Sequence, residues 1–156
     1  MENVDGLLTQ AKSGLHSLEV SKKYVDSAMK WLKVWLTDDA FSDYVPQITH
    51  LIKAENWNVL LDSFYQVIPF GTGGRRGLVG VGPNRINTWT IQASAQGHCQ
   101  YLIRQYGDEA QQRGVVLTFD VRKYTQTGIY DDTLPNPVMN LDGLQLATAA
   151  AKVYAA

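Results

Sequence analysis

The sequence predicts an α/β protein, in which a helical N-terminal extension precedes an incomplete α/β domain with a mixed sheet. Three observations predict this class. Residues 1–64 carry apolar side chains at helical spacing, residues 70–77 form a glycine-rich loop, and residues 114–120 are typical of a buried strand that is followed by a last helix. We expect the extension to cover residues 1–64 and the truncated domain residues 65–156, together forming a single structural unit.

The helices of the extension are predicted from apolar residues three and four positions apart. The clearest stripe consists of Tyr24, Ala28, Trp31, Leu32 and Trp35. An earlier stretch consists of Leu7, Leu8, Ala11 and Leu15, and Gly14 is expected to divide or weaken it. Pro46 suits the first turn of another helix, and residues 57–64 supply one more amphipathic turn or two. Trp31 and Trp35 are expected to serve core or interdomain packing.

The second half is expected to alternate between helix and strand. Asn87 or Thr88 can cap a helix that starts near Trp89 and carries Cys99 on its apolar face, as a buried thiol. The β-branched run at residues 114–120 predicts the clearest buried strand. A polar loop is expected over residues 123–137, after which Asn140 should cap a small-residue helix, Leu141 to Tyr154.

Composition narrows the function classes. The 156 residues include 14 Lys and Arg against 15 Asp and Glu, a balance that argues against a nucleic-acid binder. Positive charge is local, at Arg75, Arg76 and Arg85. One cysteine excludes an internal disulfide framework. Neither a signal peptide nor an apolar stretch of membrane-spanning length is visible, so a cytoplasmic location without a membrane partner is expected.

The loop Phe70-Gly71-Thr72-Gly73-Gly74-Arg75-Arg76-Gly77 has the chemistry of a phosphate site. Glycines let the backbone approach a ligand, and a guanidinium matches phosphate oxygens with two parallel hydrogen bonds. A dinucleotide fingerprint counted from Gly71 would need a third glycine where Arg76 stands, and no glycine-lysine pair of a Walker A loop follows. Both nucleotide motifs are therefore excluded.

The same loop resembles the F-G-T-x-G-x-R-G signature of the α-D-phosphohexomutases, in particular the phosphoglucomutase/phosphomannomutase branch. Four further stretches agree with that branch in order. They are Trp35-Leu36, the G-x-N-x-x-N stretch at 82–87, the D-x-R at 120–122 and the alanine-rich helix at 146–156. The resemblance covers roughly Trp35 to Ala156 and implies the first domain of such an enzyme. Two departures are Arg75, where the branch usually has an apolar residue, and the longer connection at 123–140.

The resemblance implies an isomerase that moves a phosphoryl group between the 1- and 6-positions of a hexose phosphate through a phosphoserine. Mg²⁺ and a hexose 1,6-bisphosphate are implied for the full-length enzyme. By position, Arg76 contacts phosphate while Thr72, Gly73 and Gly74 shape the loop. Supporting roles fall to Asn87, Asp120 and Arg122. The sequence contains no Ser-His pair, so the phosphoserine and the metal loops are expected beyond this chain, which alone should be inactive.

The implied partners are a hexose phosphate and the remaining domains of the same polypeptide, and self-association through an unpaired sheet edge is expected. Two other functions stay open: a non-catalytic phosphate- or phosphosugar-binding module, and a helical interaction domain in which the loop is only a turn. Structural roles also stay open for single residues. Arg76 could bond nearby carbonyls or a helix C-terminus, and Arg75 could be a solvated or structural charge. Arg122 could pair with Asp120, and Asn84 and Asn87 could serve as turn and cap residues.

Overall fold

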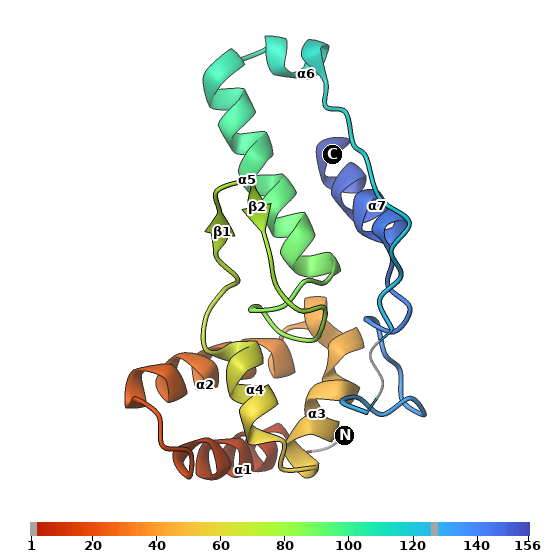
Figure 1. The fold of residues 1–156 in the computed structure, drawn as a ribbon. Helices are drawn as coiled ribbons and strands as arrows, with labels where there is room; N and C mark the ends of the chain where they lie inside the picture. Colours follow the sequence, from red (N-terminus) through yellow and green to blue (C-terminus); the bar gives the residue numbers. More distant parts are fainter. Residues whose placement is uncertain (1–2, 126–127) are drawn as a thin grey trace.

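The computed structural model describes residues 3–125 and 128–156. It is a helix-dominated α/β structure in which the described residues form one small two-stranded sheet (Figure 1). Its elements are α1 Val4–His16, α2 Lys22–Thr37, η1 Asp39–Tyr44, α3 Val45–Lys53, α4 Trp57–Phe64, β1 Phe70–Gly71, β2 Gly74–Arg75, α5 Thr88–Tyr106, α6 Glu109–Arg113 and α7 Gly143–Tyr154. The expected α/β class is thus confirmed in its coarse form, whereas the extended mixed sheet is not.

The core of the helical extension surrounds Trp35 of α2. This side chain is fully buried, and its ring stacks on Phe41 at a centroid distance of 4.3 Å. Tyr44, Phe64 and Trp89 meet it edge-on or tilted. Because Trp89 lies in the first turn of α5, the core extends past the extension into the second half of the chain. The predicted packing role of Trp31 and Trp35 is confirmed, since Trp35 is buried and Trp31 packs against the core, whereas Tyr24 of the same stripe is 46% exposed.

The expectation that Gly14 divides this helix is wrong, because α1 runs unbroken from Val4 to His16. Gly14 lies where α1 crosses the indole of Trp57, and a Cβ built there would stand 2.2 Å from the ring atom Cε2. The glycine therefore permits close approach of two helices, which offsets its weak helix propensity.

The predicted start of α5 is confirmed. Asn87 is its N-cap and accepts from the backbone N–H of Thr90 at 3.0 Å, while the Thr90 hydroxyl accepts from the Asn87 backbone N–H at 3.0 Å. Tyr44 and Thr88 share a hydroxyl hydrogen bond of 2.8 Å across to η1. The N-terminus of α5 is thus fixed both locally and to the extension.

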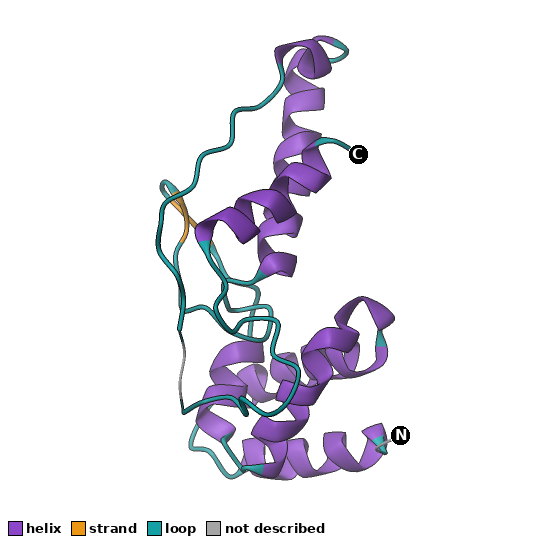
Figure 2. Ribbon diagram, turned by 90° about the vertical axis from the view of Figure 1, so that its right-hand side faces the viewer, coloured by secondary structure: helices purple, strands orange, loops and turns teal. Residues whose placement is uncertain are grey.

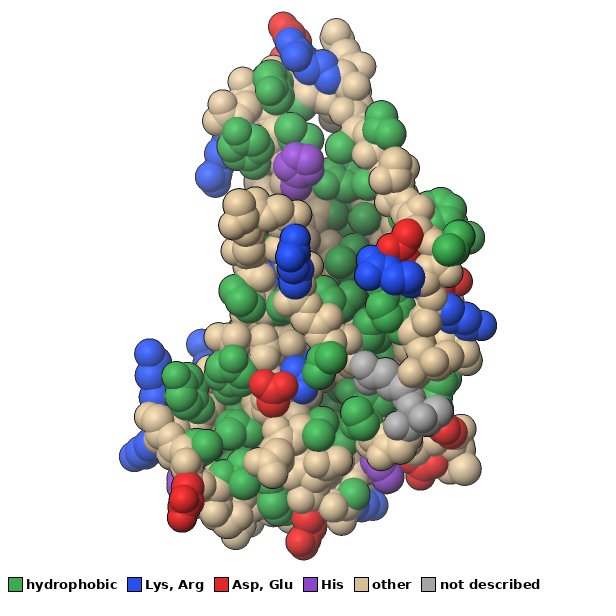
Figure 3. Space-filling model, viewed as in Figure 1, with side chains coloured by type: hydrophobic (Ala, Val, Ile, Leu, Met, Phe, Trp, Pro, Cys, Tyr) green, Lys and Arg blue, Asp and Glu red, His purple; other side chains and the backbone are tan. Residues whose placement is uncertain are grey.

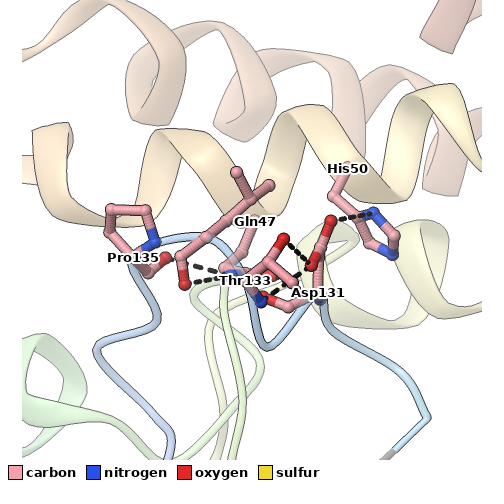
Figure 4. A network of polar contacts seen from close by, with 6 residues as sticks. Gln47, His50, Asp131, Thr133 and Pro135 are labelled. Atoms are coloured by element: carbon pink, nitrogen blue, oxygen red, sulfur yellow. Dashed lines mark hydrogen bonds and ion pairs between the residues drawn. The ribbon is translucent and has the colours of Figure 1, made fainter.

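Gln47 of α3 joins the extension to the long loop that precedes α7 (Figure 4). Its buried side-chain amide donates to the carbonyls of Asp131 and Pro135 at 2.9 and 3.0 Å. Its Oε1 accepts from the Asp131 backbone N–H at 3.0 Å. One side-chain amide thus supplies hydrogen-bond partners that these loop backbone groups would otherwise lack. Of the expected polar loop at 123–137, residues 126–127 lie outside the described residues.

The strand predicted at 114–120 does not form. Residues 115–119 belong to neither described strand, and the side chains of Val116 and Phe119 are 90% and 55% exposed. A β-branched sequence favours the extended conformation, but a ladder also needs a neighbouring strand, and the described residues supply none. Cys99, expected to be buried on the α5 face, is only half-buried.

The last helix starts two residues later than predicted. Its N-cap is Asp142, which accepts from the Gln145 backbone N–H at 2.8 Å, and the Gln145 side chain accepts from the Asp142 backbone N–H in return. This capping box satisfies two helix-end donors at once, whereas Asn140 adopts a left-handed φ of 58°. Helices α5 and α7 pack side by side, and the β1–β2 hairpin and residues 114–121 lie on the same face of the pair (Figure 2).

Candidate functional site

The glycine-rich loop folds into a short β-hairpin, in which each strand is two residues long. Phe70 pairs with Arg75 and Gly71 with Gly74, which leaves Thr72 and Gly73 at the turn. Gly74 has a φ of 134°, a conformation that side chains rarely adopt, and a Cβ on Gly71 would stand 3.1 Å from the Gly74 carbonyl oxygen. The hairpin backbone itself therefore favours glycine at position 74, and space for a side chain is tight at position 71, before any ligand is considered.

A hollow of about 310 Å³ opens at this turn, lined by Pro69, Gly71, Thr72, Gly73, Gly74 and Arg76. Arg76 is exposed and makes no hydrogen bond or ion pair with any described residue. In Figure 3, basic side chains lie near the middle of the displayed face, level with the hairpin in Figure 1. The structure thus brings together four residues singled out from the sequence: Thr72, Gly73, Gly74 and Arg76.

Arg75, the neighbouring arginine, is engaged within the protein. Its side chain is half-buried, and its Nη1 donates to the backbone carbonyl of Ile68. This contact fastens the second strand to the segment that leads into the first. Of the two adjacent arginines, Arg75 takes the structural role, and Arg76 keeps its donors free.

Arg85 and Asp62 anchor the loop that follows the hairpin. Arg85 is 6% exposed, and its Nη2 lies 2.7 Å from Asp62 Oδ2 on α4. Nearby, the Tyr130 hydroxyl accepts from the Val81 backbone N–H at 2.9 Å, and burial raises the pKa of Tyr130. The local positive charge expected at Arg85 is consequently neutralised inside the fold.

The three supporting candidates lie elsewhere. Asn87 is fully buried, and its Nδ2 donates to the carbonyls of Gly80 and Gly82 at 2.9 Å each, so it serves as a cap and turn residue. Asp120 and Arg122 pair with each other, with Nε 2.6 Å from Oδ2. Hydrogen bonds from the Arg122 backbone and side chain hold the pKa of Asp120 below its ordinary value. None of the three lines the hairpin hollow.

A second polar pair was missed by sequence reasoning. His98 of α5 and Tyr154 of α7 share a hydrogen bond of 2.7 Å between Nδ1 and the phenol oxygen. Both line a hollow of about 570 Å³ that also reaches Phe70, Arg75 and Leu117. Burial raises the pKa of Tyr154. The two residues are 56 positions apart, and no spacing rule could have joined them.

Within residues 3–125 and 128–156, no three histidine, cysteine or acidic side chains are grouped as metal ligands. None of the helices in that part of the chain is both long and apolar enough to cross a membrane.

The comparisons with known proteins support the resemblance that the hairpin sequence indicated. The chain is homologous, over part of its length, to the phosphosugar mutases of the phosphohexomutase superfamily, as the loop signature indicated. No protein-family model matches the chain, and no solved structure matches it significantly.

Three relatives illustrate the range of this class. Phosphopentomutase from Homo sapiens is 36% identical over 94 residues, which are 60% of this chain and 15% of that protein. Phosphoribomutase from Saccharomyces cerevisiae is 31% identical over 77 residues, 49% of this chain and 12% of the relative. Phosphoglucomutase from Staphylococcus haemolyticus is 39% identical over 59 residues, 38% and 10% respectively. The chain therefore matches only a small part of each relative's length.

Proposed function

We propose that this chain is an N-terminal part of a phosphosugar mutase, in which the β1–β2 hairpin contributes Arg76 to binding the substrate phosphate. The observation that carries the proposal is the difference between the two adjacent arginines, Arg75 and Arg76. One guanidinium is tied to Ile68, and the other stands unpaired at a hollow formed by glycine backbone. A free guanidinium beside accessible backbone is a suitable environment for a phosphate.

In this proposal the hairpin binds and orients the phosphate but does not transfer it. Arg76 offers two parallel N–H donors to phosphate oxygens, and the turn at Thr72 and Gly73 brings backbone close to the same anion. The phosphoserine, Mg²⁺ and the sugar bisphosphate remain expectations of the resemblance and are assigned to no residue of this chain. We therefore expect the 156-residue chain by itself to show no mutase activity.

The substrate class is proposed more broadly than the hexose phosphate expected from the signature. Relatives with comparable identity are named for pentose, ribose and glucose phosphates. All of these sugars present the same phosphate group, which is the part that Arg76 would contact. An aldose phosphate of five or six carbons is the substrate class consistent with both the signature and these names.

Binding can be tested by NMR titration of the chain with inorganic phosphate, glucose 1-phosphate and ribose 1-phosphate. We expect shifts at residues 71–76, and weakening by about tenfold or more in Arg76→Ala, because a hydrogen bond to a charged group contributes about 1.5–3 kcal/mol. Arg104→Ala is the matched control, since Arg104 is also exposed and unpaired among the described residues. Equal weakening in both variants would mean only a general loss of charge.

The mutase assignment has a separate test. The reading frame of the source gene after codon 156 should encode a Ser-His-Asn-Pro loop within a few tens of residues and then an aspartate cluster. A stop codon there would overturn the mutase proposal while leaving phosphate binding at Arg76 to be judged by the titration.

A further inference from the structure

Arg75 and Arg76 are neighbours in the sequence, but they lie on opposite faces of the β1–β2 hairpin. Arg75, with Phe70 opposite it on β1, lines the hollow of about 570 Å³ beside α5. Arg76 lines the hollow of about 310 Å³ at the turn, and the two hollows have no lining residue in common within the described part of the chain. Because successive side chains of a strand alternate between its faces, the face that Arg75 takes decides where Arg76 points.

The backbone pairing of the hairpin is too short to fix that choice by itself. Its ladder consists of Phe70 with Arg75 and Gly71 with Gly74. An isolated two-stranded hairpin is only marginally stable in water, and the register of glycine-rich strands is weakly specified. A slip of one residue would set Arg76 opposite Phe70, on the face that Arg75 now occupies. A contact outside the ladder must therefore hold the register.

Ile68, two residues before β1, is a fixed point of the fold. Its side chain is 2% exposed, and a Cβ on Gly77 would stand 2.6 Å from its Cδ1. Its backbone N–H donates to the carbonyl of Pro83 at 2.9 Å, and the next residue, Asn84, donates from its backbone N–H to the carbonyl of Ser63 on α4 at 3.0 Å. The Ile68 carbonyl is thus an acceptor whose position is set by the helical extension.

Arg75 ties the hairpin to this acceptor. Its Nη1 donates to the Ile68 carbonyl, seven positions earlier in the sequence. Its Nε is buried and has no hydrogen-bond partner within the described residues. A buried donor without a partner is costly, so an arginine with no other contact would turn outward to water. The bond to Ile68 is therefore the interaction that keeps Arg75 on its face of the hairpin.

We propose that Arg75 is a positioning residue for the phosphate site, because its bond to Ile68 fixes the hairpin register and so directs Arg76 to the hollow at the turn. The inference rests on the proposed function, in which Arg76 contacts the phosphate, and Arg75 acts through Arg76. Without the bond the hairpin samples the slipped register, which withdraws Arg76 from the phosphate. The apparent affinity then falls in proportion to the fraction of hairpins that keep the competent register.

Phosphate binding is the first test, measured by NMR titration of the 156-residue chain with inorganic phosphate and followed at the Nε–H signal of Arg76. We expect Arg75→Met to weaken binding about tenfold, as for a hairpin that is competent about one-tenth of the time. Arg75→Lys keeps a long cationic donor for the Ile68 carbonyl and should restore most of the affinity. Arg104→Met is the control for the loss of one positive charge, since Arg104 is exposed and unpaired among the described residues. Binding by Arg75→Met no weaker than by Arg104→Met would overturn the proposal.

The hairpin register is the second test, measured in the same variants without phosphate. Cross-strand proton contacts of Phe70 with residue 75 and of Gly71 with Gly74 report the native ladder. We expect Arg75→Met to lose these contacts and Arg75→Lys to keep them. Intact contacts in Arg75→Met would overturn the proposal even if binding weakened, because the lost charge alone would then explain the weakening. If the unsubstituted chain binds no phosphate, the proposed function fails, and the cross-strand contacts still decide whether Arg75 fixes the direction of Arg76.

Discussion

Similar apolar side chains are buried in the helical extension but exposed in the segment at 115–121. Trp35 is fully buried by aromatic rings, whereas Val116 is 90% exposed. A helix satisfies its backbone hydrogen bonds within itself, so α1 to α4 need only cover their apolar faces to become stable. A strand must find both a backbone partner and a cover. The comparison shows which part of a short chain can complete its structure alone.

The largest expected effect comes from emptying the core of the extension. Trp35→Ala should lower the free energy of unfolding by about 3–5 kcal/mol, because it leaves a cavity among Phe41, Phe64 and Trp89. Phe119→Ala should lower it by less than about 0.5 kcal/mol in the monomer, since Phe119 is 55% exposed. Urea denaturation at low protein concentration measures both. Equal losses would break the contrast between the two regions.

Two glycines of α1 sharpen the contrast within a single helix. Gly14→Ala should destabilise the protein by about 1–3 kcal/mol, because its Cβ would overlap the Trp57 ring. Gly6→Ala is the matched control: its Cβ would meet Asn3 at an ordinary 3.8 Å, so the better helix propensity of alanine should stabilise by up to about 1 kcal/mol. Thermal unfolding of the two variants should shift in opposite directions. A stabilised Gly14→Ala would show that Trp57 moves aside without cost.

Helix positions were predictable because their causes are local. The apolar spacing around Trp35, Pro46 in the first turn of α3 and the cap at Asn87 each act within a few residues. The prediction that Gly14 divides the helix failed, because the residue that makes a glycine necessary there, Trp57, lies 43 positions away in the sequence. The start of α7 was missed because Asp142 with Gln145 forms a better cap than Asn140 does.

The candidate site was likewise predictable only where its residues are close together in the sequence. The hairpin residues from Thr72 to Arg76 are contiguous, so one loop sequence was enough to group them. The sequence left both adjacent arginines open to a structural or a binding role, and only the fold tied Arg75 to Ile68. The partnership of His98 with Tyr154 joins two helices and had no sequence pattern to predict it. The strand predicted at 114–120 did not form, because a ladder needs a neighbouring strand and β-propensity does not report whether one is present.

The smallest expected effect concerns the loop that Gln47 fastens to the extension. The Thr133 hydroxyl and backbone N–H donate to Asp131 at 2.6 and 2.9 Å, and they hold the pKa of this carboxyl below the ordinary 3.8, with a weaker contribution from His50. A lowered folded-state pKa stabilises the fold above the unfolded value, and this stability is lost as pH falls through the folded value. Thr133→Val should raise the pKa of Asp131 toward 3.8 and move acid unfolding to higher pH, whereas Thr133→Ser should leave both unchanged. Carbon NMR titration of the Asp131 carboxyl measures the shift directly. An unchanged pKa in Thr133→Val would mean that the backbone N–H of residue 133 lowers the pKa of Asp131 without help from the hydroxyl. The loop would then keep its stability in acid without this side chain.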